Sequence, residues 1–243
     1  MTLLFEKNKF VTPGDQLAEG DFIPGNNTYR DGEKIFASRI GLANLDGKTV
    51  YVVAVKGCYV PNIGDFIIGK VIDMTTSGWI VDINSPYDAM LSVSEAVERQ
   101  FNTQRDALSR IYNIGDLLMA KIIAYDRTRG PVLTTLDRGL GKITRGRVIS
   151  ITPTKIPRLI GKKGSMVNLL KTETNCYINV GQNGMVLISG STPEDEDLAI
   201  LAILKIEAEA HTSGLTERIS ALINDMKIKR GLTNVQSKTG ETG

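Results

Sequence analysis

Two glycines and two lysines stand together in the run Gly161-Lys162-Lys163-Gly164. The lysines supply ammonium groups, and glycine lets a ligand approach the backbone closely because it has no side chain. A helical pattern of apolar residues follows, so backbone amides of this loop would lie at a helix N-terminus, which attracts anions. These groups suit a phosphodiester backbone, which they would position without reading the bases. A G-x-x-G spacing is a weak signal by itself and depends on its surroundings.

The distribution of charge along the chain favours an anionic ligand for this region. The 243 residues include 29 basic and 27 acidic ones, for a formal net charge of +2. Residues 139–190 hold eight basic residues and a single acidic one, Glu173, which is the excess expected of a surface that neutralises phosphates. A solvated basic face would give the same count, so charge alone leaves both interpretations open.

No residue pattern predicts a catalytic centre, a metal site or a cofactor site. The run from Gly64 to Lys70 reads G-x-x-x-x-G-K, but Val71 follows it where a P-loop needs a hydroxyl for magnesium. Three acids that could suggest a nuclease metal cluster are better explained as strand-end and turn residues: Asp65, Asp73 and Asp82. We therefore expect a binding protein without enzyme activity. A nuclease with its own active site is the enzyme-class alternative.

Composition indicates an ordinary globular protein, with 42% hydrophobic and 23% charged residues. The two cysteines, Cys58 and Cys176, and the single histidine, His211, are too few for a disulfide framework or a cysteine-histidine zinc site. The first residues lack the apolar segment of a signal peptide, and no apolar run approaches the roughly 18 residues of a membrane span. A cytoplasmic location is expected.

The first half of the chain reads as β-structure. Two strand-like runs, residues 34–42 and 49–56, flank Asp46-Gly47 and predict a hairpin. A near-repeat follows, in which Asn-Ile-Gly-Asp begins at Asn62 and again at Asn113, each time ahead of a strand. Two strands that begin with the same turn suit one small β-barrel over residues 61–138. Within it, Ser92 to Glu95 fits a capping box that starts a helix.

The second half changes to the order β-α-α-β-β-α. A strand is expected over residues 147–152, the glycine loop then leads into a helix that ends near Leu170, and Asn183-Gly184 predicts a hairpin turn between two strands. A long helix should begin at Thr192, with Pro193 in its first turn, and an amphipathic helix follows Gly214. The chain from Gly231 onward is expected to be a loose tail.

Together the element order and the glycine loop resemble a KH domain, the module whose G-x-x-G loop clamps about four nucleotides of single-stranded RNA. The barrel resembles an S1 domain in residues 64–65, 69–71, 77–82 and 115–116. An N-terminal β-domain followed by S1 and one KH domain resembles the family of ribosomal RNA-processing protein 4. This resemblance covers nearly the whole chain and is closest in residues 57–65 and 85–89.

The resemblance implies a mainly β plus α/β chain of three small domains. These are an N-terminal β-domain (1–60), an S1-type OB-fold barrel (61–138) and a type I KH domain with an extra C-terminal helix (139–230), ahead of a flexible tail (231–243). It implies a non-catalytic RNA-binding cap subunit of an archaeal exosome. Its expected partners are single-stranded RNA, other cap subunits and a hexameric ring of RNase PH-like subunits, which the N-terminal domain docks and which degrades or processes RNA from 3' to 5'.

The expected RNA contacts of the KH domain comprise the loop and an apolar floor for bases: Gly161, Lys162, Lys163, Gly164, Arg158, Ile160, Val167 and Ile178. The barrel departs from the S1 pattern, because Ser77, Ile80 and Ser92 stand where many S1 domains carry stacking aromatics and a histidine. Trp79 is expected in the core or at an interface rather than as a platform for bases. Weaker candidates on the barrel are four residues with aromatic rings or charge: Tyr87, Tyr125, Arg127 and Arg129.

Two other binding-class interpretations stay open. One is an S1/KH factor associated with transcription or translation. The other is an assembly scaffold whose KH loop is vestigial, which the missing S1 aromatics partly favour. Ring association without RNA affinity would support the scaffold.

Overall fold

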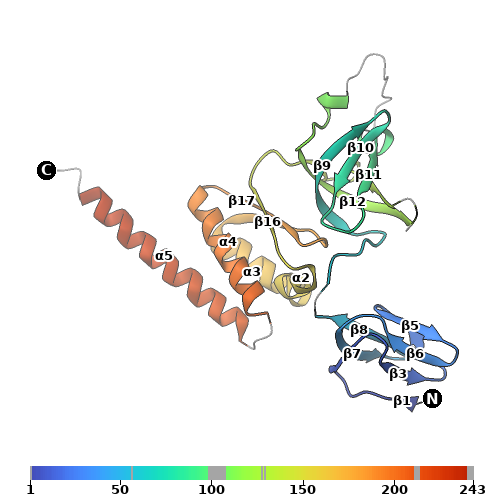
Figure 1. Cartoon of the computed structure of the whole chain (residues 1–243). Coiled ribbons are helices and arrows are strands. Elements are labelled where there is room, and N and C mark those ends of the chain that lie inside the picture. The colour runs from blue at the N-terminus through green and yellow to red at the C-terminus, as the bar shows by residue number, and fades with distance from the viewer. Residues whose placement is uncertain are drawn as a thin grey trace. The chain divides into compact units, whose positions relative to one another are not determined.

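The computed structural model describes residues 2–55, 57–97, 108–126, 128, 130–210 and 214–239, and side chains up to residue 228. The chain divides into two compact units, Met1–Gly57 and Cys58–Gly243 (Figure 1). Buried apolar side chains form a core in the first unit and two further cores in the second.

The first unit consists of two four-stranded sheets. One sheet has the order β1 (Thr2–Leu3), β3 (Gln16–Glu19), β6 (Lys34–Ala37), β5 (Thr28–Asp31), and the other has the order β2 (Lys9–Val11), β7 (Gly41–Asp46), β8 (Thr49–Ala54), β4 (Ile23–Pro24). Its core includes the fully buried Leu17, Ile35 and Val50.

The predicted hairpin across Asp46-Gly47 is present as β7 and β8. The expected first strand, however, is two strands in different sheets, because the chain bends between β6 and β7. At the start of β7 the chain requires a glycine, since a Cβ on Gly41 would lie 2.2 Å from the Val53 carbonyl oxygen. The register of β7 on β8 therefore depends on the absence of a side chain at this position.

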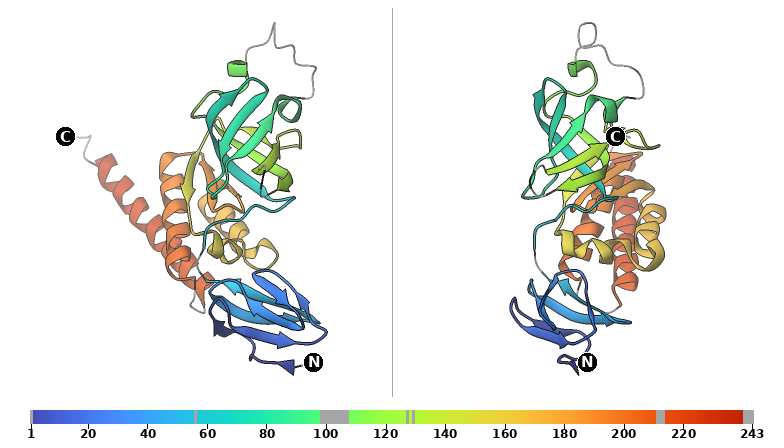
Figure 2. Two further views of the ribbon diagram at one scale, coloured as in Figure 1. Left: turned by 45° about the vertical axis from the view of Figure 1, so that its right-hand side comes forward. Right: turned by 90° about the vertical axis from the view of Figure 1, so that its right-hand side faces the viewer.

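The second unit begins with a closed barrel of five strands: β9 (Phe66–Thr75), β10 (Gly78–Asp82), β11 (Ala89–Ser92), β12 (Leu117–Asp126) and β13 (Gly130–Thr134). Pairing of β13 with both β11 and β12 closes it, and β14 (Gly141–Lys142) adds to β12 (Figure 2). Trp79 is fully buried in the barrel core, which decides between the core and interface positions that the sequence left open. Its indole nitrogen donates to the Tyr112 carbonyl at 3.0 Å, and the two rings meet edge to face.

The near-repeat forms two equivalent turns that lead into the antiparallel strands β9 and β12. The carboxylate of Asp65 accepts the Asn62 amide at 3.1 Å, and that of Asp116 accepts the Asn113 amide at 2.8 Å. Gly64 has φ +92° and Gly115 φ +94°, the left-handed region that favours glycine. The repeat therefore reflects one turn geometry used twice.

A short helix, α1 (Val93–Ala96), follows β11, so a helix does begin where the capping box predicts. The Ser92 side chain makes no cap bond to the helix, and its hydroxyl lies 3.0 Å from that of Ser94 instead. The capping-box prediction was wrong in this detail. One further turn, η1 (Leu108–Arg110), precedes β12.

The remainder of the unit has the order β-α-α-β-β-α that the sequence predicts. Its elements are β15 (Arg147–Ser150), η2 (Pro153–Lys155), α2 (Ile156–Ile160), η3 (Lys162–Gly164), α3 (Ser165–Thr174), β16 (Cys176–Val180), β17 (Met185–Gly190) and α4 (Pro193–Ala208). The sheet order is β15-β17-β16, so β16 is an edge strand. Thr192 caps α4 through a bond from the Asp195 amide at 3.2 Å, with Pro193 at the first helical position, as expected.

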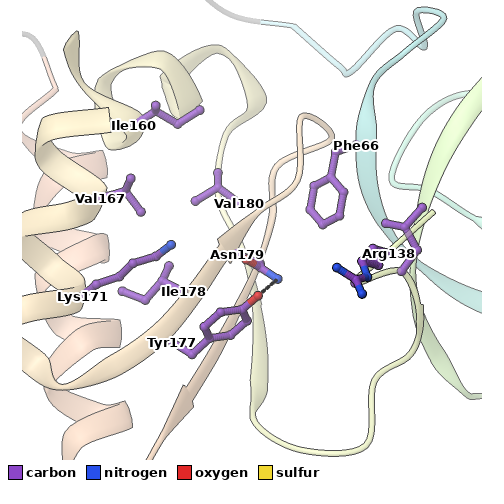
Figure 3. Close-up of a pocket in the computed structure, with 11 residues that line it drawn as sticks. Phe66, Arg138, Ile160, Val167, Lys171, Tyr177, Ile178, Asn179 and Val180 are labelled. Atoms are coloured by element: carbon purple, nitrogen blue, oxygen red, sulfur yellow. Dashed lines mark hydrogen bonds between the residues drawn. The ribbon is translucent and has the colours of Figure 1, made fainter. Parts of the chain in front are cut away.

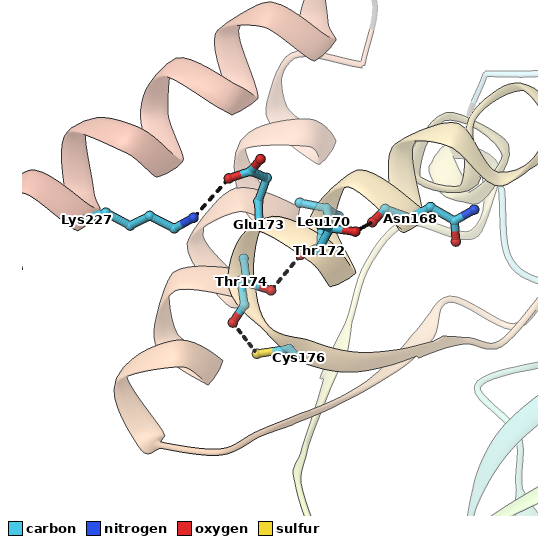
Figure 4. A network of polar contacts seen from close by, with 7 residues as sticks. All are labelled: Asn168, Leu170, Thr172, Glu173, Thr174, Cys176 and Lys227. Atoms are coloured by element: carbon cyan, nitrogen blue, oxygen red, sulfur yellow. Dashed lines mark hydrogen bonds and ion pairs between the residues drawn. The ribbon is translucent and has the colours of Figure 1, made fainter.

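The last helix, α5 (Leu215–Thr239), continues beyond Gly231, where the loose tail was expected to begin, so this helix ends later than predicted. It contacts α3 through an ion pair in which the Lys227 ammonium lies 2.9 Å from the Glu173 carboxylate (Figure 4). Close by, Thr174 donates to the Leu170 carbonyl and Cys176 to the Thr174 carbonyl at the end of α3.

The hairpin between β16 and β17 is hydrogen-bonded to the barrel. Asn183 is fully buried, and its side-chain amide donates to the carbonyls of Ile68 at 2.7 Å and Ile83 at 2.9 Å. The Ile68 amide donates back to the Asn183 side chain at 3.3 Å, and the Gln182 amide donates to the Phe66 carbonyl at 2.8 Å. The hairpin that the sequence predicts thus also connects the three-stranded sheet to the barrel by hydrogen bonds.

Candidate nucleic-acid interface

The glycine loop connects α2 to α3 through a sharp change of backbone direction. Gly161 has φ +74° and ψ 178°, Lys163 has φ +52°, and Gly164 has φ +80°. Three residues with positive φ turn the chain so that α3 starts at Ser165 and the loop precedes its first amides. The loop therefore sits where the helix dipole favours an anion.

The two glycines of the loop differ in whether a side chain would fit at their positions. A Cβ on Gly161 would lie 2.8 Å from the Met166 backbone nitrogen and 2.9 Å from its Cβ, so no side chain fits there. At Gly164 the nearest atom to such a Cβ, a side-chain nitrogen of Asn168, is 3.6 Å away. Gly161 is thus required by space and by backbone conformation, and Gly164 by conformation alone.

The lysines of the loop are available to a ligand. Lys162 and Lys163 are exposed, and neither forms an ion pair or hydrogen bond with another of the residues that the structure describes. Arg158 is exposed one helical turn earlier, on α2. The loop thus presents two ammonium groups to solvent.

Other basic residues of the segment 139–190 are engaged elsewhere. Lys142 pairs with Asp116 at 2.5 Å, Arg147 pairs with Asp197 at 2.5 Å, and Lys155 donates to the Glu207 carbonyl. The acids in the two ion pairs lie outside the segment, so counting charges along the sequence overstates its free positive charge.

An apolar floor adjoins the loop, in a groove of about 440 Å³ (Figure 3). Ile160 from α2, Val167 from α3 and Ile178 from β16 all line it, so the structure brings these three predicted residues together. Ile178 is almost fully buried, while Ile160 and Val167 are half-buried against the same core. A base entering the groove would meet Ile160 and Val167 more readily than Ile178.

Comparison with known proteins places these features in a family. Family models match residues 8–56 as the exosome RNA binding protein RRP4 N-terminal domain, residues 58–124 as the RRP4 S1 domain, and residues 146–205 as a KH domain. Exosome complex component Rrp4 of Ignisphaera aggregans is 44% identical over 242 residues, covering 96% of each chain. The chain belongs to the Rrp4 family.

Further Rrp4 relatives support this assignment. Exosome complex component Rrp4 of Thermococcus kodakarensis is 40% identical over 250 residues, covering 100% of this chain and 97% of that one. A crystal structure described as an exosome complex RNA-binding protein is similar with a TM-score of 0.68 and 42% identity, covering 72% of this chain and 99% of that chain. The resemblance inferred from the glycine loop and the barrel is thereby confirmed.

The RNA-binding candidates on the barrel of this Rrp4-family chain are less exposed than the loop lysines, where the structure describes them. Tyr87 and Tyr125 are half-buried and form an edge-to-face pair with ring centroids 5.7 Å apart. Arg127 and Arg129 lie outside the described residues. Tyr87 and Tyr125 thus partly cover each other, and a role for them in stacking RNA bases stays a prediction.

Sequence reasoning missed eight of the eleven residues that line the groove, among them four with large side chains. Phe66 and Arg138 come from the barrel and the segment after it, and Lys171 and Tyr177 come from α3 and β16. The exposed aromatic Tyr177 on a predicted strand was a usable signal. Phe66 and Arg138 gave none, because only the packing of the hairpin on the barrel brings them to the groove.

The residues that the structure describes contain no group of three or more histidine, cysteine, aspartate or glutamate side chains placed to hold a metal ion. Among them, no helix has the length and apolar character needed to cross a membrane.

Proposed function

We propose that this Rrp4-family chain is a non-catalytic RNA-binding cap subunit of an exosome. The KH loop holds the backbone of a single RNA strand, and the S1 barrel helps to guide it to a hexameric ring of RNase PH-like subunits, which degrades or processes it from the 3' end. The observation that carries the proposal is the pair of exposed lysines, Lys162 and Lys163, in the positive-φ glycine loop at the start of α3, where neither has an ion-pair partner among the described residues.

Each part of the loop has a role in this proposal. Lys162 and Lys163 contact phosphates, and Gly161 and Gly164 allow the backbone to come close to them. Arg158 adds charge beside the loop, and Ile160, Val167 and Ile178 form the apolar surface under the bases. Phosphate contacts of this kind position a strand and leave sequence preference to other groups.

The N-terminal unit is proposed to dock the ring. Exposed large apolar side chains support this role: Leu3, Leu4, Phe10 and Ile23. We further propose that the domains extend over residues 1–60, 61–138 and 139–230, that other cap subunits are neighbours, and that the protein acts in the cytoplasm. Archaeal relatives named as exosome components support the assembly.

Salt-dependent binding tests the role of the loop. Fluorescent single-stranded RNA is titrated with the full chain and with the Lys162→Asp/Lys163→Asp variant, and the RNA is checked for integrity afterwards. Each lost phosphate contact should reduce the log-log salt slope by about 0.7, so the double variant should bind more weakly with a slope shallower by roughly 1.4. The matched control, Lys7→Asp/Lys34→Asp, makes the same change in net charge on the exposed surface of the first unit.

The outcomes separate the alternatives. Intact RNA with weaker, less salt-dependent binding supports the proposal, and cleavage by the chain alone would instead indicate a nuclease. Unchanged RNA affinity of the Lys162→Asp/Lys163→Asp variant would overturn the role of the KH loop. An equal loss of affinity in the Lys7→Asp/Lys34→Asp control would show that the loop lysines act only through the net charge of the protein. Failure of the unmodified chain to bind RNA, together with ring association, would favour the scaffold.

A further inference from the structure

A continuous row of apolar side chains runs around the outer surface of the barrel. Ile80 of β10 pairs directly with Met90 of β11. Met90 pairs in turn with Val132 of β13, and Val132 pairs with Ala124 of β12. Side chains at directly paired positions lie about 5 Å apart, so these four residues are neighbours across four strands. Met90 is 47% exposed, Ala124 is exposed, and the other two are half-buried.

The row points away from the barrel core. Trp79 and Val81 on β10, and Ala89 and Leu91 on β11, are buried in that core. Because side chains alternate between the two faces of a strand, the row residues between them point outward. The hairpin between β16 and β17 forms its hydrogen bonds with other residues of the barrel: Phe66, Ile68, Ile83, Asn84 and Met119. The row is therefore outside the hydrogen-bonded contact that this hairpin makes.

Aspartates border the row on one side. The antiparallel register of β10 on β11 brings Asp82 opposite Asp88, one position beyond the last pair of these strands. Asp126 pairs with Gly130, and a Cβ on Gly130 would lie 2.9 Å from the Asp88 carbonyl oxygen, so the three aspartates line one border. All three are exposed, and none forms an ion pair with another residue that the structure describes.

The face formed by this row and its aspartate border disfavours RNA. Asp73 of β9 lies opposite Ile80 and adds a fourth acid. Lys70, opposite Asp82, is the one basic side chain at these positions within the described part of the chain. The excess of acids repels phosphates, and the row carries no aromatic ring on which a base could stack. The departure from the S1 pattern at Ile80 thus coincides with a surface that suits a different ligand.

We propose that this acidic and apolar face binds a protein partner whose contact surface presents apolar side chains flanked by lysines or arginines. Contiguous exposed apolar patches bordered by polar residues mark interaction sites, and an apolar centre with a polar rim is the usual anatomy of a protein interface. The border aspartates select the partner, because opposite charges across an interface speed association and like charges exclude wrong partners. Met90, within the row, has a flexible side chain that adapts to different apolar surfaces.

The inference goes beyond the proposed function, because it assigns to the barrel a contact that needs no RNA. Guidance of RNA by the barrel then depends on residues outside this face. The KH loop is not part of the face, so the two can be tested separately.

Binding of two synthetic helical peptides to the full chain tests the face. One peptide carries leucines along one side with lysines on both flanks, and in the other each lysine is replaced by glutamate. The unmodified chain should bind the Leu/Lys peptide at least about 10-fold more tightly than the Leu/Glu peptide. Met90→Gln should weaken binding of the Leu/Lys peptide about 10-fold, because the apolar area of Met90 is then no longer buried against the leucines. Ile114→Gln is the matched control, since Ile114 is 58% exposed and lies outside the face.

The aspartate border is tested by the triple variant Asp82→Asn/Asp88→Asn/Asp126→Asn. This variant should bind the Leu/Lys peptide more weakly and with less dependence on salt, because salt screens the charge pairs that it removes. Asparagine can still accept the backbone amide bonds that the Asp82 and Asp126 side chains accept. The matched control removes three exposed acids from the first unit: Asp31→Asn/Glu33→Gln/Asp46→Asn.

The inference is overturned if the unmodified chain fails to bind the Leu/Lys peptide, or if the face variants and their controls lose affinity equally. Crosslinking of RNA to the face would also overturn it. For this, RNA that carries photoreactive uridines is irradiated with the chain, and no crosslink should fall within residues 78–92. The Lys162→Asp/Lys163→Asp variant should bind the Leu/Lys peptide at least as tightly as the unmodified chain, so a failure of the proposed function leaves this inference standing. Circular dichroism of each variant checks that the fold is kept.

Discussion

Asn183 and Ile68 exchange hydrogen bonds across 115 positions of sequence. The Asn183 side-chain nitrogen donates to the Ile68 carbonyl at 2.7 Å, and the Ile68 amide donates to the Asn183 side-chain oxygen at 3.3 Å. One asparagine thus serves both backbone groups of a barrel residue. Since Asn183 is fully buried, these groups have no access to water if the side chain is removed.

Replacing Asn183 with alanine should therefore destabilise the second unit by about 3 kcal/mol, because several buried backbone groups lose their partner at about 1–3 kcal/mol each. Asn183→Asp should be no better, since its carboxylate would face the carbonyl oxygens of Ile68 and Ile83. Urea denaturation measures the free energy of unfolding. Gln182→Ala is the control, because the exposed Gln182 bonds to the barrel through its backbone amide, which the substitution keeps. This variant should lower the free energy of unfolding by no more than about 0.5 kcal/mol.

The loop glycines should differ in their tolerance of alanine. Gly161→Ala introduces a Cβ 2.8 Å from a backbone nitrogen in a conformation that suits almost only glycine, so we expect a loss of about 2 kcal/mol or more in the free energy of unfolding. Gly164→Ala makes only ordinary van der Waals contacts, the nearest at 3.6 Å, and should cost about 1 kcal/mol for its left-handed backbone. Equal losses in thermal or urea denaturation would contradict this difference.

Tyr59 should make the protein sensitive to alkali. Burial, followed by its hydrogen bond to Asp65 at 2.6 Å, raises the pKa of the Tyr59 hydroxyl above its ordinary value of 10.0. A raised pKa in the folded state gives stability that is present below about pH 10 and is lost at higher pH. Tyr59→Phe should be less stable near pH 8 but lose less stability between about pH 9 and 11, as measured by denaturation at each pH.

Burial also raises the pKa of Tyr112, which forms part of the same barrel core. The unmodified chain should therefore show the steepest alkaline loss of stability, and Tyr59→Phe/Tyr112→Phe the shallowest. An alkaline profile that neither substitution changes would refute a role for these hydroxyls.

Asp116 should contribute to stability in the opposite pH range. The Asn113 amide bond and then the Lys142 ammonium lower the pKa of the Asp116 carboxyl. A lowered pKa gives stability that is present above about pH 4 and is lost as the pH falls through the folded-state value. Asp116→Asn should show less loss of stability than the unmodified chain between about pH 5 and 2. Lys142→Gln should keep part of the acid sensitivity, because the amide bond, the larger cause, remains.

Features built from near neighbours could be predicted from the sequence. The Thr192 cap, the paired Asn-Ile-Gly-Asp turns and the glycine loop all depend on bonds or backbone conformations within a few residues, so residue types at fixed spacing determine them. Ser92 shows the limit of this reasoning. Its spacing to Glu95 fits a capping box, yet its hydroxyl lies against that of Ser94 instead. The order of strands and helices, and with it the KH resemblance, also followed from local pattern.

Tertiary structure decided which charges stay free and what faces the groove. Lys142 and Arg147 looked like part of a basic patch, but acids 26 and 50 positions away neutralise them, and sequence spacing carries no information about such pairs. Asn183 has the sequence pattern of an ordinary turn residue. Only the packing of the hairpin on the barrel brings its side chain within hydrogen-bonding distance of the barrel backbone. That same packing places Phe66 and Arg138 beside the KH strand. Contacts over such separations depend on the whole fold, because the chain must close around its cores before they can form.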